Sequence, residues 1–174
     1  MRRSSSIVED IKAIQPRGEP VAMNVAFPPA KNEWRALIDD ADMVIECTGD
    51  DEALLELQEY PWPNSRQFVS FSLGWKAARL YYFSCLAPYF SVQIFREHYA
   101  PWKALELADA SHEEIPWEGI GCWHPVFPAR AEDVMLGAAL AVKFVEAAVL
   151  GDKGDHFQVY SLEPSTLKLA RPFQ

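Results

Sequence analysis

Four consecutive polar residues, Thr48, Gly49, Asp50 and Asp51, follow an apolar stretch at 43–47. The stretch has the composition of a short buried strand, and the residues from Asp51 onward have the pattern of a helix. In open α/β sheets, ligands lie at the carboxyl ends of strands, beside the N-termini of helices. This turn is therefore the first candidate for contact with a nucleotide or a divalent metal ion.

The same turn also has a purely structural interpretation. Asp50 or Asp51 would accept hydrogen bonds from the first backbone N–H groups of the helix and so cap it. The region carries several further carboxylates, which we expect to be solvated helix ends rather than metal ligands. They are Asp39, Asp40, Asp42, Glu46 and Glu52.

Cysteine thiols are the other groups that could do chemistry. Cys122 lies in a segment rich in glycine and proline and is followed closely by His124, whose imidazole could lower the pKa of the thiol. Cys122 is therefore a candidate nucleophile, and the alternative is that both side chains only pack the turn before the next helix. Cys47 and Cys85 belong to apolar strands, which predicts buried structural thiols. The 3 cysteines include no CxxC pair, so neither a disulfide framework nor a zinc site is expected.

Composition limits the class of protein. The chain has 174 residues, of which 49% are hydrophobic and 13% aromatic, and this is enough for one domain with a substantial core. A formal charge of −9 argues against non-specific nucleic-acid binding and against docking on an anionic membrane. No signal peptide is recognisable, and charged residues interrupt the longest apolar segment, at 134–150, as in a core helix. We therefore expect a cytoplasmic protein.

The periodicity of apolar residues predicts the elements that position these groups. Helices are expected at 4–14, 31–40, from 51 onward, at 90–107 with an interruption at Pro101, and at 132–150. Strands are expected at 21–27, 43–47, 67–73, 77–85, 157–162 and 166–169.

The order of these elements predicts the fold class. Helices and strands alternate in the first half, which indicates a mostly parallel sheet flanked by helices. The strands at 67–73 and 77–85 are separated by so short a link that they should pair directly, and the last two strands predict a C-terminal antiparallel hairpin. The expected structure is a single α/β domain over 1–174 with a partial Rossmann-like fold.

A glycine-rich phosphate loop is missing from this pattern. The chain contains 8 glycines, yet no GxGxxG sequence follows a predicted strand. Thr-Gly after a strand does occur in dinucleotide-linked oxidoreductases, but without that loop such an activity is not expected.

The ordered motifs resemble the later part of the ThiF/MoeB/HesA family of adenylating enzymes, whose fold ubiquitin-activating enzymes share. The similar segments are KAIQP at 12–16, ADMVIECTGDD at 41–51, FVSFSLGWKAARLYYF at 68–83, GIGCWHPVFPAR at 119–130 and FQVYSLEPSTLKLAR at 157–171. No single motif carries the resemblance, which rests on their order along nearly the whole chain.

The resemblance implies an activity and a set of site residues. Enzymes of this family use ATP and Mg²⁺ to adenylate the C-terminal carboxylate of a ubiquitin-like protein, and some then transfer the acyl group to a cysteine. The family's magnesium-binding aspartate falls at Gly49 or Asp50, of which Asp50 keeps the carboxylate. Nucleotide contacts are implied for Arg3, Thr48 and Gly49. The implied acceptor thiol is that of Cys122.

The resemblance also implies partners. The family's glycine-rich ATP loop would lie upstream of Met1, so we expect an incomplete adenylyltransferase domain, inactive alone, with no cofactor of its own. Its expected partner is a ubiquitin-like protein or a complementary chain, in a homo- or hetero-oligomer. The alternative is a non-catalytic interaction or dimerisation module of the same fold, with docking faces on the helix at 132–150 and the aromatic segment at 81–102.

Overall fold

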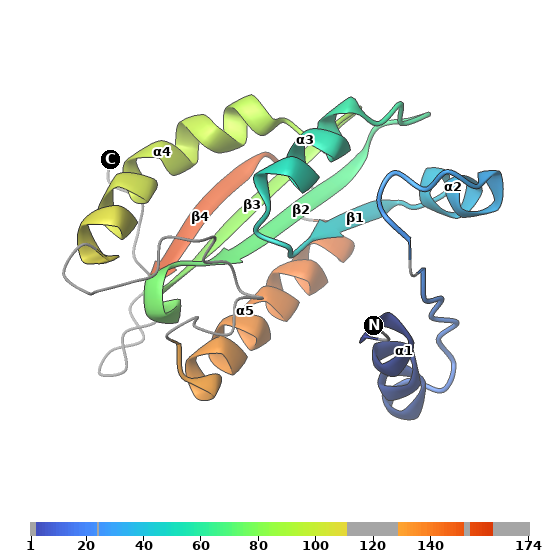
Figure 1. The fold of residues 1–174 in the computed structure, drawn as a ribbon, viewed down its shortest axis with the longest axis horizontal. Coiled ribbons are helices and arrows are strands. Elements are labelled where there is room, and N and C mark those ends of the chain that lie inside the picture. The colour runs from blue at the N-terminus through green and yellow to red at the C-terminus, as the bar shows by residue number, and fades with distance from the viewer. Residues whose placement is uncertain (1–2, 24, 111–128, 152–153, 162–174) are drawn as a thin grey trace. The chain divides into compact units, whose positions relative to one another are not determined.

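A computed structural model describes residues 3–23, 25–110, 129–151 and 154–161 of the chain (Figure 1). The residues fall into two compact units, 1–40 and 41–174. The elements in chain order are α1 (Arg3–Ile14), α2 (Asn32–Asp39), β1 (Met43–Glu46), α3 (Asp51–Glu59), β2 (Arg66–Leu73), η1 (Trp75–Ala77), β3 (Arg79–Ala87), α4 (Val92–Ala110), α5 (Ala131–Val149) and β4 (His156–Ser161).

The first unit contains the helices α1 and α2, as predicted. The Arg35 guanidinium donates a hydrogen bond of 2.9 Å to the backbone oxygen of Pro29, which ties α2 to the segment before it. The strand predicted at 21–27 is wrong, because the described residues of that range form no strand. The segment ends in Pro28 and Pro29, which have no N–H groups to donate to a sheet.

The second unit is built on a four-stranded sheet in the order β1-β2-β3-β4. β1 pairs with β2 in parallel, whereas β2 with β3 and β3 with β4 are antiparallel pairs. The prediction of a mostly parallel sheet is therefore wrong, although the class α/β is correct. Two adjacent parallel strands need a crossover connection between them. Among the described elements, α3 makes this connection, from β1 to β2.

The hairpin predicted from the short link between β2 and β3 is confirmed. Arg66 to Leu73 pairs in register with Ala87 to Leu80, and η1 makes the turn between the two strands. β4 confirms the strand predicted at 157–162, but it pairs with β3. The strand predicted at 166–169, and with it the C-terminal hairpin, lies outside the described residues.

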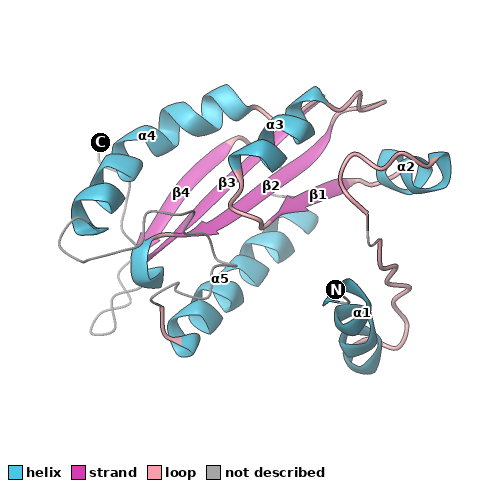
Figure 2. Ribbon diagram, in the orientation of Figure 1, coloured by secondary structure: helices cyan, strands magenta, loops and turns pink. Residues whose placement is uncertain are grey.

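Helices cover both faces of the sheet, with α3 and α4 on one face and α5 on the other (Figure 2). The face under α4 is aromatic, and the edge-to-face ring pairs Phe68–Phe90 and Phe83–Phe90 have centroids 6.0 and 5.5 Å apart. On the opposite face, Phe144 of α5 stacks on Tyr82 with a centroid distance of 4.6 Å. The aromatic segment at 81–102 thus supplies buried core, since Phe83 is only 2% exposed.

α4 runs without a break through Pro101, where the sequence predicted an interruption. Proline removes one hydrogen bond from the helix and normally bends or ends it. Here the turn around the proline is packed on the sheet, because Tyr99 and Trp102 lie edge-on to the ring of Tyr81 at 5.0 and 6.2 Å. Across the described ranges, no helix combines the length and apolarity needed to cross a membrane.

A largely but not fully buried carboxylate joins α4 to the turn between β2 and β3. Glu106 accepts hydrogen bonds from the Trp75 backbone N–H at 2.5 Å, from the Arg79 guanidinium at 2.9 Å, and from the Tyr81 hydroxyl. The side chains of Arg79 and Glu106 are 17% and 11% exposed. The carboxylate lies so close to Gly74 that an added Cβ would collide with it. We call these residues the Glu106 cluster.

The substitution Glu106→Gln tests how much the Glu106 cluster stabilises the fold. It weakens the hydrogen bonds that the partly buried Arg79 guanidinium and the Tyr81 hydroxyl donate to residue 106, so we expect the free energy of unfolding to fall by about 2 kcal/mol. The control is Glu146→Gln, which breaks the Lys143–Glu146 pair, whose side chains are 71% and 57% exposed. It should cost less than about 0.5 kcal/mol in the same urea titration. Equal effects of the two substitutions would contradict this assignment.

The Glu106 cluster also predicts a dependence of stability on pH. Burial and the hydrogen bond to Glu106 raise the pKa of Tyr81 above its ordinary value of 10.0. The phenol ionises more readily in the unfolded chain, so its contribution is present below pH 10 and is lost as the pH rises further. Between about pH 8 and about pH 11, the wild type should lose more stability than Tyr81→Phe. A constant difference between the two proteins would show that this phenol does not titrate differently on folding.

Candidate functional site at the carboxyl end of β1

The predicted strand–turn–helix unit is present. β1 ends at Glu46, and α3 begins at Asp51. Asp50 has an extended backbone, and its carboxylate accepts a hydrogen bond of 2.8 Å from the backbone N–H of Glu52. The capping interpretation of Asp50 is therefore confirmed.

The centre of the turn is Glu46, which is only 6% exposed. Its Oε1 accepts hydrogen bonds from the backbone N–H and the hydroxyl of Thr48, the latter at 2.5 Å, and from the Gly49 N–H at 3.2 Å. Its Oε2 accepts a hydrogen bond of 2.8 Å from the Ser70 hydroxyl on β2. One carboxylate therefore connects the end of β1, the turn and the neighbouring strand. We call this arrangement the Glu46 network.

Gly49 gives the turn its shape. Its φ of +66° lies in the left-handed region, which residues other than glycine rarely adopt. This conformation returns the backbone toward Glu46, so that the N–H groups of Thr48 and Gly49 point at a carboxylate of the same turn. The following residue, Asp50, is thereby placed at the exposed N-terminus of α3.

A magnesium nucleotide consists of a metal ion and a phosphate chain, and the turn is better suited to the metal ion than to the phosphates. Thr48 and Gly49 direct their N–H groups at Glu46, so these donors do not form a cradle for phosphate. Asp50 uses Oδ1 for its cap, and its exposed carboxylate has a second oxygen that a magnesium ion could take. Within the described ranges, no three His, Cys, Asp or Glu side chains gather around a metal-sized space. A single carboxylate suits a metal that arrives with its phosphates.

The other predicted site residues lie elsewhere in the chain. Arg3 is the first residue of α1, in the first unit. Cys122 and His124 lie outside the described residues. Cys85 is buried, as predicted, and this burial raises the pKa of its thiol. Cys47 is exposed, which corrects the prediction of a buried thiol, because β1 ends one residue earlier and is the first strand of the sheet that the described residues form.

An apolar groove lies between the sheet and α5, on the face opposite to the Glu46 network. Its volume is about 510 Å³, and β1, β2 and β3 contribute Ile45, Phe71 and Leu80 to its lining. Cys47, directly after β1, also lines it. We call it the β1–α5 groove.

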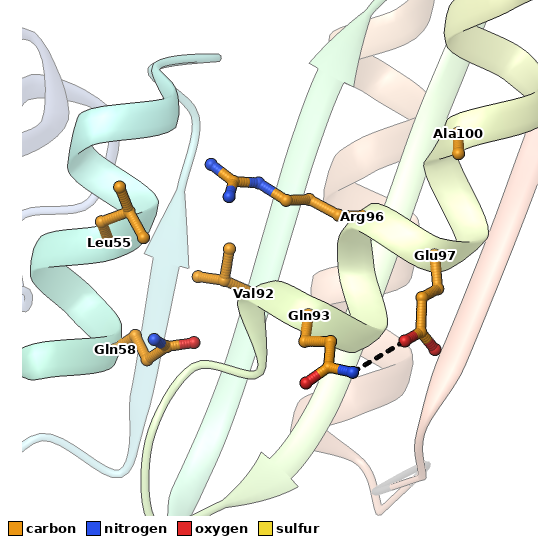
Figure 3. A pocket seen from close by; sticks show the side chains of 7 residues that line it. All are labelled: Leu55, Gln58, Val92, Gln93, Arg96, Glu97 and Ala100. Atoms are coloured by element: carbon orange, nitrogen blue, oxygen red, sulfur yellow. Dashed lines mark hydrogen bonds between the residues drawn. The ribbon is translucent and has the colours of Figure 1, made fainter.

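A smaller hollow of about 420 Å³ lies between α3 and α4 (Figure 3). Its Arg96 is 3.9 Å from the Asp51 carboxylate, and Glu97 accepts a hydrogen bond of 2.9 Å from Gln93. The two carboxylates offset the charge of Arg96, so this hollow does not select an anion. Its lining residues are Leu55, Gln58, Val92, Gln93, Arg96, Glu97 and Ala100.

Sequence reasoning missed the roles of Glu46 and Ser70. Glu46 was counted among the solvated carboxylates, whereas the structure buries it beside Ser70 on the next strand. A usable signal was present, because a charged residue inside the apolar run MVIEC must find hydrogen-bond donors when the strand is buried. The hydrogen bond from Ser70 to Glu46 could not be predicted in this way, because it depends on the register of β1 with β2.

The chain is therefore an α/β protein with a mixed sheet. Its candidate site is the turn between β1 and α3, where Asp50 is exposed. No protein-family model matches the chain. Over 143 residues the chain is 34% identical to the ATP-dependent ubiquitin transferase-like protein Cap2 of Enterobacter hormaechei subsp. hoffmannii (strain UCI 50).

The alignment with Cap2 is unequal in extent. It covers 82% of this chain but 23% of the relative, so the chain spans less than a quarter of the relative's length. The chain is therefore a distant homologue of part of an ATP-dependent ubiquitin transferase-like protein. This agrees broadly with the resemblance to the ThiF/MoeB/HesA family, whose members act on ubiquitin-like proteins.

Stability measurements can separate the Glu46 network from the helix cap. Glu46→Ala leaves the buried Ser70 hydroxyl and the turn N–H groups without their acceptor, and should cost about 3 kcal/mol. Asp50→Ala removes only an exposed cap and should cost about 1 kcal/mol. Urea unfolding of both variants measures the two free energies. A smaller cost for Glu46→Ala than for Asp50→Ala would contradict the central position of Glu46.

Proposed function

We propose that this chain is part of a ThiF-type adenylating domain, which contributes to ATP-dependent activation of a ubiquitin-like protein and is inactive alone. The observation that carries the proposal is the alignment with Cap2 over 82% of the chain. The order of motifs supports it, because ADMVIECTGDD forms a strand, a turn and a helix as the resemblance requires.

In this proposal the magnesium ion that accompanies ATP binds at the carboxyl end of β1. Asp50 would hold Mg²⁺ through the carboxylate oxygen that does not cap α3. The metal, when bound, neutralises charge on the phosphates of ATP. Glu46 does not bind the metal, since both of its oxygens already accept hydrogen bonds; it fixes the backbone that places Asp50.

The same geometry explains why the chain should be inactive alone. Adenylation needs positive groups and backbone donors around the triphosphate. The backbone donors of the turn at 48–49 point at Glu46. We therefore assign the phosphate-binding loop to a complementary chain or domain. Cys122 remains the proposed acyl acceptor, and the proposed setting is the cytoplasm.

A chimera with the Cap2 relative tests the proposal. The segment of Cap2 that aligns with this chain is replaced by the present sequence, and exchange between ATP and pyrophosphate is measured in the presence of its ubiquitin-like substrate. We expect the chimera to be active and Asp50→Ala to lower the rate by about a hundredfold. The matched control is Asp42→Ala, at the opposite end of β1, which should retain activity.

Two results would contradict this proposal. One is a folded chimera without exchange activity, which would mean that the chain cannot serve as part of the domain. The other is exchange at the full rate of the chimera by the present chain alone, which would mean that no complementary part is needed.

A further inference from the structure

The hydroxyl of Thr48 connects the buried carboxylate of Glu46 to the exposed aspartate at the start of α3. It donates a hydrogen bond of 2.5 Å to Glu46 Oε1 and accepts one of 3.1 Å from the backbone N–H of Asp50. The Asp50 carboxylate accepts the N–H of Glu52 at 2.8 Å, and the Ser70 hydroxyl ties Glu46 to β2. A continuous series of hydrogen bonds therefore runs from β2 to the first turn of α3.

Chemistry fixes the direction of the bonds that Thr48 makes. An ionised carboxylate only accepts hydrogen bonds, so the hydroxyl proton of Thr48 points at Glu46. A lone pair of the same hydroxyl oxygen then accepts the N–H of Asp50. A hydroxyl has one proton, so while this bond stands the side chain of Thr48 has none to donate to a phosphate.

Two contacts hold Asp50 in this arrangement. Its N–H is bonded to Thr48, and its Oδ1 is bonded to the N–H of Glu52. A residue that is held both at its backbone and at one carboxylate oxygen keeps its other oxygen, Oδ2, in one direction. Asp50 is exposed, and an exposed side chain without such contacts would sample several rotamers.

We propose that Thr48 is a positioning residue, whose hydroxyl transmits the fixed position of Glu46 to Asp50. This inference rests on the proposed adenylation and deepens it, because it gives Thr48 a role other than contact with the nucleotide. The hydroxyl favours metal binding because Asp50 does not have to be ordered when the magnesium ion arrives.

A set of single substitutions isolates the hydroxyl. Thr48→Val removes it and keeps a branched side chain of nearly the same shape, and we expect the variant to fold because Thr48 is exposed. Thr48→Ser keeps the hydroxyl and loses only a methyl group. The control is Ser72→Ala, which removes a hydroxyl from β2 at a residue that lines the β1–α5 groove.

Hydrogen exchange of the purified chain, followed by NMR, measures the positioning without a nucleotide. In Thr48→Val we expect the N–H groups of Asp50 and Glu52 to exchange about fivefold faster. The amide of Glu52 is the more informative of the two, because its bond is to the Asp50 carboxylate and not to Thr48. In Thr48→Ser and Ser72→Ala both amides should exchange as in the wild type.

The second measurement is the Mg²⁺ dependence of ATP–pyrophosphate exchange by the chimera with Cap2. Thr48→Val should raise the Mg²⁺ concentration at half-maximal rate about fivefold, with a maximal rate within about twofold of the parent chimera. Thr48→Ser should restore the parent Mg²⁺ dependence. The rate lost in Asp50→Ala should not return at high Mg²⁺, because the ligand itself is missing. A loss of stability alone would lower the maximal rate and leave the half-maximal Mg²⁺ concentration unchanged.

The inference is overturned if Thr48→Val leaves exchange of the Glu52 amide unchanged, or if it leaves the Mg²⁺ dependence of an active chimera unchanged. It is also overturned if Thr48→Ser is as impaired as Thr48→Val, since the methyl group would then be responsible. With an active chimera, each of these results leaves the adenylation proposal standing. A folded chimera without exchange activity would instead contradict both proposals.

Discussion

Burial of the Glu46 carboxylate is the constraint on which the carboxyl end of β1 depends. A carboxylate with 6% exposure is tolerated only if its oxygens find donors, and here Thr48, Gly49 and Ser70 supply them. Satisfying that carboxylate fixes the register of β1 against β2, closes the turn through a left-handed glycine, and starts α3 at Asp50. The geometry of the candidate site follows from one buried charge.

The Glu46 network also limits what the site can do alone. Backbone donors at the start of a helix are a natural anion site, but in this turn they are engaged by the protein's own carboxylate. Asp50 remains as an exposed group of the right chemistry for a metal. Our proposal therefore gives Asp50 the metal side of a magnesium–nucleotide site. Arg79 of the Glu106 cluster is paired within the protein, since it lies 2.9 Å from Glu106 and 2.8 Å from Asp109.

Local patterns in the sequence predicted much of this fold. The strand before Thr48, the cap at Asp50 and the short link between β2 and β3 each have a local physical cause, and each was predicted correctly. The strand was expected to be buried, however, and Ile45 is 47% exposed. The sheet was predicted wrongly as mostly parallel, because the β2–β3 hairpin and the pairing of β4 with β3 make the later strand pairs antiparallel. Burial of Glu46 depends on the register of β1 with β2, and exposure of Cys47 depends on where β1 ends. Alternation along the chain reports neither of these.

The most direct test of the central claim is calorimetric titration of the purified chain with ATP and Mg²⁺, with Asp50→Ala as the comparison. If this chain holds only the metal side of an adenylating site, neither protein should bind the nucleotide measurably. Binding by the wild type that Asp50→Ala abolishes would contradict the account, because a complete nucleotide site would then exist within this chain.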